Sequence, residues 1–158
     1  MAGVAGTAAM DEYWRILRKT KPEWVKSEEE PTSHKVVRRA MQKAGVRSPS
    51  RAVRESGGKA VHWTYGAGWG MVVGVSRAAG VPFTWGGGLA FGAGLWALSD
   101  EWMLYKLELA KHPKEYPMRT HATALGAHLV YGVGVWAAMK ALGGLAGGKK
   151  HGFLRRAA

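Results

Sequence analysis

The stretch AVHWTYGAGWGMVVGVSRAAGVPFTWGGGLAFGAGLWAL, which runs from Ala60 to Leu98, contains one charged residue, Arg77. Seventeen uncharged residues precede Arg77 and 21 follow it. A helix needs about 20 mainly apolar residues to cross the ~30 Å hydrocarbon core of a bilayer. A further uncharged run of 18 residues, Ala122–Met139, follows a polar loop. These runs predict an all-α integral membrane protein with about three transmembrane helices, at 60–80, 82–99 and 121–145.

Tryptophans lie near the ends of the apolar runs, where amphipathic rings favour the membrane interface. They are Trp63, Trp85, Trp96, Trp102 and Trp136. The alternative is a compact soluble bundle with buried, glycine-rich helices. It is disfavoured because none of the three runs repeats a polar face every 3.6 residues.

Glycines recur every four residues in these runs, a spacing that places them on one side of a helix. In a membrane such positions let two helix backbones approach closely and gain dispersion contacts. The glycines predicted to pack helices are Gly66, Gly70, Gly74, Gly88, Gly92 and Gly132. Pro82 lies between the first two runs and suits a tight turn. The first two membrane helices are therefore predicted to form a tight antiparallel hairpin.

Charge and composition exclude some classes of protein and indicate the orientation of the chain in the membrane. The 158 residues carry a net charge of +12 and include no cysteine, which excludes a disulfide framework, a thiol nucleophile and a cysteine-based metal site. Residues 1–59 contain 13 Lys/Arg, and the 99–121 loop contains four more. The positive-inside rule favours placing both segments in the cytoplasm. A basic tail, 149–158, lies on the other side in this topology.

The N-terminal segment, 1–59, is predicted to hold short helices and turns. Asp11–Thr20 has acids first and bases last, which suits the helix dipole. Ser33–Ala44 predicts a basic amphipathic helix with a serine cap, lying on an anionic bilayer surface or on the membrane helices. Pro49–Gly58 is interpreted as a linker. Met1–Met10 is apolar but too short to span a bilayer.

Short motifs between His62 and Met139 point to a known family. They are His62 with Gly70, Trp85-Gly86-x-Gly88, the loop prolines Pro113 and Pro117, and Gly126-Ala127-His128-Leu129-Val130 with Trp136 downstream. This segment resembles the YagU-like family of bacterial inner-membrane proteins of unknown function. The resemblance implies a small multi-pass protein of the bacterial inner membrane and supplies no activity. Met1–Arg15 resembles the end of the family's first membrane helix, which would explain the short apolar stretch at the start of the sequence.

Polar residues near membrane depth are the candidates for chemistry. They are His62, Asp100, Glu101, His121 and His128. With a cytoplasmic N-terminus they converge near one membrane surface, where imidazoles and carboxylates can bind a divalent metal or relay protons. The simpler interpretation is that His128 hydrogen-bonds a neighbouring helix and that Asp100 and Glu101 mark a helix end in water. No HExxH, GxSxG or phosphate-binding loop occurs, so we expect neither an enzyme nor a cofactor.

The resulting functional hypothesis is a non-enzymatic scaffold or accessory subunit in the bacterial inner membrane. Its partners are the lipid bilayer and either further copies of the chain or a larger membrane complex. The second hypothesis is a minor transport or proton- or metal-handling role through His62, Glu101 and His128. A third class, a soluble nucleic-acid binder using residues 1–59, is disfavoured because the basic residues flank apolar blocks instead of forming one face.

Overall fold

The described part of the chain folds into helices without any strand, which confirms the all-α prediction. The structure is a computed structural model that describes residues 1–25 and 30–154, with side chains described as far as residue 143. The helices are α1 (Ala2–Thr20), α2 (Pro22–Val25), α3 (Thr32–Lys43), α4 (Arg51–Ala78), α5 (Trp85–Trp96), the π-helix η1 (Ala97–Met103), α6 (Leu104–Lys106), the 3-10 turn η2 (Pro113–Glu115) and α7 (Met118–Leu154).

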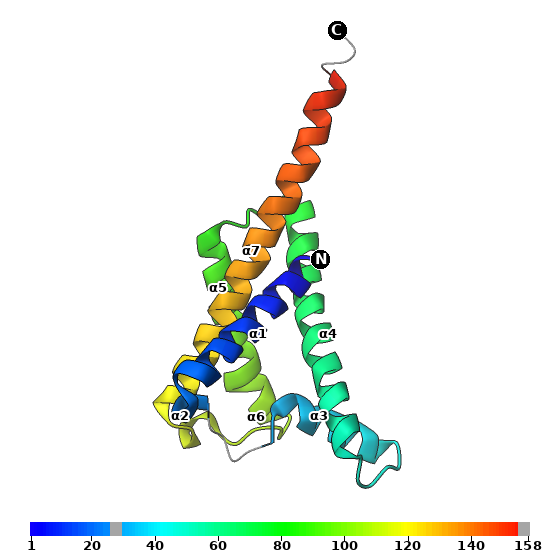
Figure 1. The fold of residues 1–158 in the computed structure, drawn as a ribbon, viewed down its shortest axis with the longest axis vertical. Coiled ribbons are helices and arrows are strands. Elements are labelled where there is room, and N and C mark those ends of the chain that lie inside the picture. The colour runs from blue at the N-terminus through cyan, green and yellow to red at the C-terminus, as the bar shows by residue number, and fades with distance from the viewer. Residues whose placement is uncertain (26–29, 155–158) are drawn as a thin grey trace.

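The longest helix, α7, organises the bundle (Figure 1). Helix α1 packs along one side of α7 and α5 along another, while α4 packs on α1 and α3 packs on the first half of α4. The core of α7 is a stripe at four-residue spacing: Ala127, Tyr131, Val135 and Met139 are all buried. This spacing keeps one face of a helix toward its neighbours, so α7 presents a continuous apolar stripe to α1 and α5.

The predicted tight hairpin between the first two apolar helices is wrong. Helices α4 and α5 are joined by a short connection, yet each packs its glycines against a different partner. A Cβ built on Gly66 or Gly70 would meet Thr7 or Gly3 of α1, and one built on Gly88 or Gly92 would meet α7. The glycine spacing correctly indicated close helix packing. It did not identify the partners, because a glycine face specifies only that some backbone lies nearby.

The last two of the six predicted packing glycines, Gly132 and Gly74, differ from each other. Gly132 of α7 faces the Gly88 carbonyl of α5, so that pair of glycines is reciprocal. Gly74 is the exception, since a Cβ there would lie 3.7 Å from the Met139 methyl group, an ordinary contact. Gly74 therefore does not mark a close approach of two backbones.

The predicted linker Pro49–Gly58 is also wrong, because α4 begins at Arg51. Ser50 caps that helix by accepting a hydrogen bond from the Val53 N–H at 3.3 Å. Gly57 and Gly58, which suggested a flexible segment, leave room for Val37 and His34 of α3. The proposed boundary between residues 59 and 60 therefore falls inside a helix, and the amphipathic helix α3 rests on α4. Helix α3 begins at Thr32, one residue before the predicted serine cap.

The second apolar helix does not end at residue 99. It continues through the π-helical turn Ala97–Met103 and ends at Lys106. Asp100 and Glu101 are therefore inside a helix, facing histidines of α7, rather than at a helix end in water. A π-helical turn inserted in a helix is frequent at functional sites.

Among the described residues, one helical segment is long and apolar enough to cross a membrane: Met118–Gly143 of α7, 26 residues. It contains most of the predicted third span, 121–145. Helix α5 alone has 12 residues, and the first turns of α4 carry the charges of Arg51, Arg54 and Glu55. The backbone of the predicted basic tail is helical as far as Leu154, and residues 155–158 lie outside the described part of the chain.

Candidate functional site

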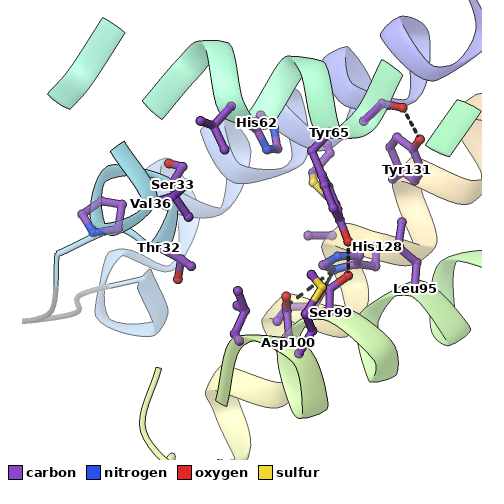
Figure 2. Close-up of a pocket in the computed structure, with 18 of the residues that line it drawn as sticks. Thr32, Ser33, Val36, His62, Tyr65, Leu95, Ser99, Asp100, His128 and Tyr131 are labelled. Carbon is purple, nitrogen blue, oxygen red and sulfur yellow. Dashed lines mark hydrogen bonds and ion pairs between the residues drawn. The ribbon is translucent and has the colours of Figure 1, made fainter. Parts of the chain in front are cut away.

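A cavity of about 530 Å³ lies between α4 and the α5–η1–α6 helix, with α1 and α7 behind it (Figure 2). It exists because α4 and α5 diverge instead of packing together. Its walls run from Val61 to Gly66 on α4 and from Leu95 to Leu104 on the opposing helix. Helix α3 contributes Thr32, Ser33 and Val36. Aromatic contacts connect α4 with α5. The ring of Trp69 on α4 packs against the ring of Phe91 on α5, and Phe91 also packs against Phe83.

Two tyrosines span the inner end of the cavity. The Tyr65 hydroxyl of α4 lies 2.5 Å from the Ser99 hydroxyl of η1 (Figure 2). The Tyr131 hydroxyl of α7 donates a hydrogen bond of 2.6 Å to the Gly66 carbonyl. Breaking a buried hydrogen bond costs free energy, because the unpaired polar group has lost its hydration and has no protein partner in exchange. Together the two bonds tie α4 to η1 and α7 at this depth.

Asp100 and His128 face each other across the cavity wall. His128 Nδ1 lies 3.0 Å from the Ala124 carbonyl and 3.8 Å from Asp100 Oδ2. A carbonyl only accepts, so Nδ1 carries a proton and donates it to the Ala124 carbonyl. Burial raises the pKa of the Asp100 carboxyl, and the neighbouring His128 imidazole opposes that rise. The described residues offer Asp100 no partner closer than His128.

His121 and Glu101 form a second and tighter pair. His121 Nδ1 lies 2.6 Å from Glu101 Oε1, and Nε2 lies 3.1 Å from the Pro113 carbonyl. Both ring nitrogens thus face acceptors. An imidazolium, which donates from both ring nitrogens, satisfies both contacts. This pair anchors the start of α7 to η1.

His62, the fifth predicted residue, also lines the cavity but pairs elsewhere. Its Nε2 lies 3.1 Å from Asp11 Oδ1 on α1. The structure therefore brings His62, Asp100 and His128 to one cavity and places Glu101 and His121 next to it. Among the described side chains, residues 1–25 and 30–143, no three His, Asp or Glu are grouped so as to hold a metal ion.

Three participants were not predicted from the sequence. Asp11 pairs with His62 because α1 lies across α4, and nothing in the sequence indicates that crossing. Tyr65 lies three residues after His62, a spacing that puts both side chains on one face of a helix, so it was open to prediction. Ser99 was overlooked because the helix was expected to end there.

Comparison with protein-family models, curated proteins and solved structures found no match. The resemblance to the YagU-like family consequently stays a prediction, and the functional argument depends on the geometry of the chain itself.

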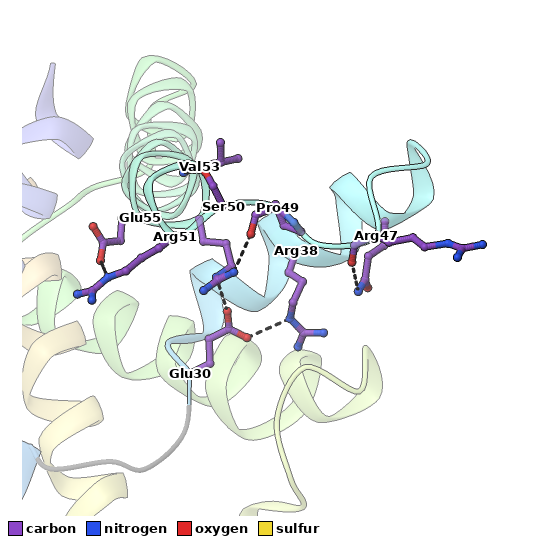
Figure 3. A network of polar contacts seen from close by, with 10 residues as sticks. Glu30, Arg38, Arg47, Pro49, Ser50, Arg51, Val53 and Glu55 are labelled. Atoms are coloured by element: carbon purple, nitrogen blue, oxygen red, sulfur yellow. Dashed lines mark hydrogen bonds and ion pairs between the residues drawn. The ribbon is translucent and has the colours of Figure 1, made fainter.

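A network of ion pairs holds α3 beside the cavity (Figure 3). Glu30 lies immediately before α3 and pairs with Arg38 of α3 at 3.1 Å and with Arg54 of α4 at 3.4 Å. Arg54 also donates to the Pro49 carbonyl at 2.7 Å. One carboxylate thus connects α3, α4 and the connection between them.

Replacing Glu30 with glutamine is expected to destabilise the α3–α4 contact by up to about 1 kcal/mol, because both ion pairs are partly exposed to water. Thermal unfolding of the purified chain measures the effect. The control is Glu55→Gln, which removes a local pair with Arg51 on the surface of α4. A smaller loss for Glu30→Gln than for the control would show that the network does not hold α3 in place.

Replacing Glu101 with glutamine is expected to cost about 1.5–3 kcal/mol, because it removes a hydrogen bond between charged groups that lie mostly out of water. The unfolding midpoint reports the loss. Glu108→Gln is the matched control, since the Glu108 side chain is 85% exposed. Equal midpoints for the two variants would contradict the anchoring role given to the His121–Glu101 pair.

Proposed function

We propose that this chain is a small multi-pass protein of the bacterial inner membrane that serves as a non-enzymatic scaffold or accessory subunit. The observation that carries the proposal is the exposure of large apolar side chains over a part of the chain with almost no charge. Met71 and Val75 on α4 are 69% and 65% exposed, and Trp85 at the start of α5 is 62% exposed. Water-soluble proteins rarely expose contiguous apolar surface of this kind, whereas lipid or a partner helix covers it.

The direction of the helices supports the same placement. Helix α4 begins, the α5–α6 helix ends and α7 begins at one end of the bundle (Figure 1). That end carries the basic residues of 1–59 and of the 99–121 loop. At the other end are Arg77 and Lys140, whose ammonium lies 5.4 Å from the Trp136 ring centre. The three proposed spans, 60–80, 82–99 and 121–145, then cross the bilayer with the basic end in the cytoplasm.

A scaffold role predicts that the exposed face of α4 contacts another protein. A photo-crosslinking amino acid at Val75 is expected to give one discrete adduct with a second copy of the chain or with a partner subunit. The same group at Gly68, which also has open space around it, tests whether the contact is confined to one face. Adducts with lipid alone at both positions would contradict the scaffold role and leave the membrane placement intact.

The second candidate function is proton handling through the imidazole–carboxylate pairs. The observation that favours it is that His128 faces Asp100 and His121 faces Glu101 within one region of the bundle. In that case His128→Ala abolishes proton coupling across reconstituted vesicles while the protein remains folded. Unchanged proton flux with alanine at His62, Glu101 and His128 together would eliminate this function.

A further inference from the structure

The cavity between α4 and the α5–η1–α6 helix has the size and lining of a ligand site. Its volume of about 530 Å³ is within the range of roughly 300–1,000 Å³ found for pockets that enclose drug-sized molecules. Most of its wall is apolar and comes from every long helix of the bundle. Representative residues are Met10, Trp14, Val36, Val61, Leu95 and Met103.

The charged groups on the cavity wall are not balanced. Asp100 is the only carboxylate among the described lining residues, and none of those residues is Lys or Arg. The Nδ1 proton of His128 is donated to the Ala124 carbonyl. The hydroxyls of Tyr65 and Ser99 bond to each other. The lining therefore offers one carboxylate and contains no Lys or Arg to pair with it.

The position of Asp100 makes this imbalance costly. A carboxylate surrounded by apolar side chains stays charged only beside a cation or several hydrogen-bond donors, and otherwise takes up a proton. The ion-pair partner of Asp100 among the described side chains, His128 Nδ1, lies 3.8 Å away, beyond hydrogen-bond distance. A ligand carrying N–H donors on a positive charge supplies what this wall lacks.

We propose that the cavity binds a lipophilic primary amine, with its ammonium group on Asp100 and its apolar body between Trp14, Val61 and Leu95. A primary ammonium has three donors and a positive charge, which suit the Asp100 carboxylate. A carboxylic acid of the same size is excluded by repulsion from Asp100. A quaternary ammonium brings charge without N–H donors and binds more weakly. This inference does not depend on the scaffold role, because the cavity is formed by this chain alone.

The test uses the full chain in lipid nanodiscs made of zwitterionic lipid, with n-octylamine, n-octyltrimethylammonium, n-octanol and octanoate as the four probes. Saturable binding is measured by calorimetry above the partitioning of each probe into empty nanodiscs. We expect n-octylamine to bind at least tenfold more tightly than the other three. We also expect Asp100→Asn, which keeps the side-chain shape, to lower the affinity for n-octylamine at least tenfold.

Glu108→Gln provides the control, since Glu108 is an exposed carboxylate beside the cavity residues Leu107 and Leu109. It is expected to bind n-octylamine as the unsubstituted chain does. An equal loss in Asp100→Asn and Glu108→Gln, a preference for octanoate, or the absence of saturable binding by n-octylamine would each overturn the proposal. Failure of membrane insertion is detected separately by fractionation, so the two proposals are tested independently.

Discussion

Replacing Gly70 with alanine is expected to push α1 away from α4 and to lower the free energy of unfolding by about 1–3 kcal/mol. A Cβ at Gly70 would lie 2.2 Å from the Gly3 Cα and 2.3 Å from the Gly3 nitrogen. These are backbone atoms, so no rotamer change relieves the overlap. The two helices must separate and lose their dispersion contacts along the whole crossing. Thermal unfolding in a mild detergent measures the loss.

The control for Gly70→Ala is Gly68→Ala on the same helix. A Cβ at Gly68 meets nothing within 4 Å, so this variant is expected to be neutral or to gain up to about 1 kcal/mol from the better helix propensity of alanine. The same comparison applies to α5, where a Cβ at Gly92 would lie 2.3 Å from the His128 carbonyl oxygen and one at Gly94 has open space. Equal stabilities within each pair would mean that the helices do not approach at these glycines.

Replacing Met71 with lysine is expected to remove most of the chain from the membrane fraction. Met71 is on the outward face of α4, near the middle of the proposed span 60–80, and is 69% exposed. A lysine at the centre of a membrane helix costs about 2.5–3.5 kcal/mol for insertion. At an exposed position of a water-soluble protein the same substitution changes stability by less than about 0.5 kcal/mol. The share of the protein recovered with washed membranes distinguishes these outcomes.

Val53→Lys is the matched control for Met71→Lys. Val53 is on the same helix, is 39% exposed, and lies among the charged first turns of α4 outside the proposed span. It is expected to leave membrane recovery unchanged. Full recovery of Met71→Lys with the membranes would show that the outer face of α4 does not contact lipid.

The elements that the sequence predicts well are those whose signal is local. The uncharged runs around Gly66–Gly74, Gly88–Gly92 and Ala122–Met139 all fall within helices, and the four-residue spacing of glycines does mark close backbone contacts. The errors arise where a residue type that suggests flexibility is present because another helix packs closely against it. Gly57 and Gly58 suggest a linker, but they lie within α4 at positions where α3 packs too closely for a larger side chain.

The candidate site shows the same limit. The five histidines and carboxylates were named from their positions near helix ends, and the structure does gather them at one region of the bundle. The pairing of His62 with Asp11 was not predictable, because it depends on α1 crossing α4. The cavity was not predictable either. It arises because α4 and α5 pack on different neighbours and so diverge below the aromatic contact of Trp69 with Phe91.

Membrane fractionation tests whether the apolar helices lie in a bilayer. Membranes from cells that express the chain are washed with high salt, then with alkaline carbonate, and finally dissolved in detergent. We expect the protein to stay with the membranes through both washes and to be released by detergent alone. Release by salt or carbonate would contradict it, and the exposed side chains of Met71 and Val75 would then need a protein partner to cover them.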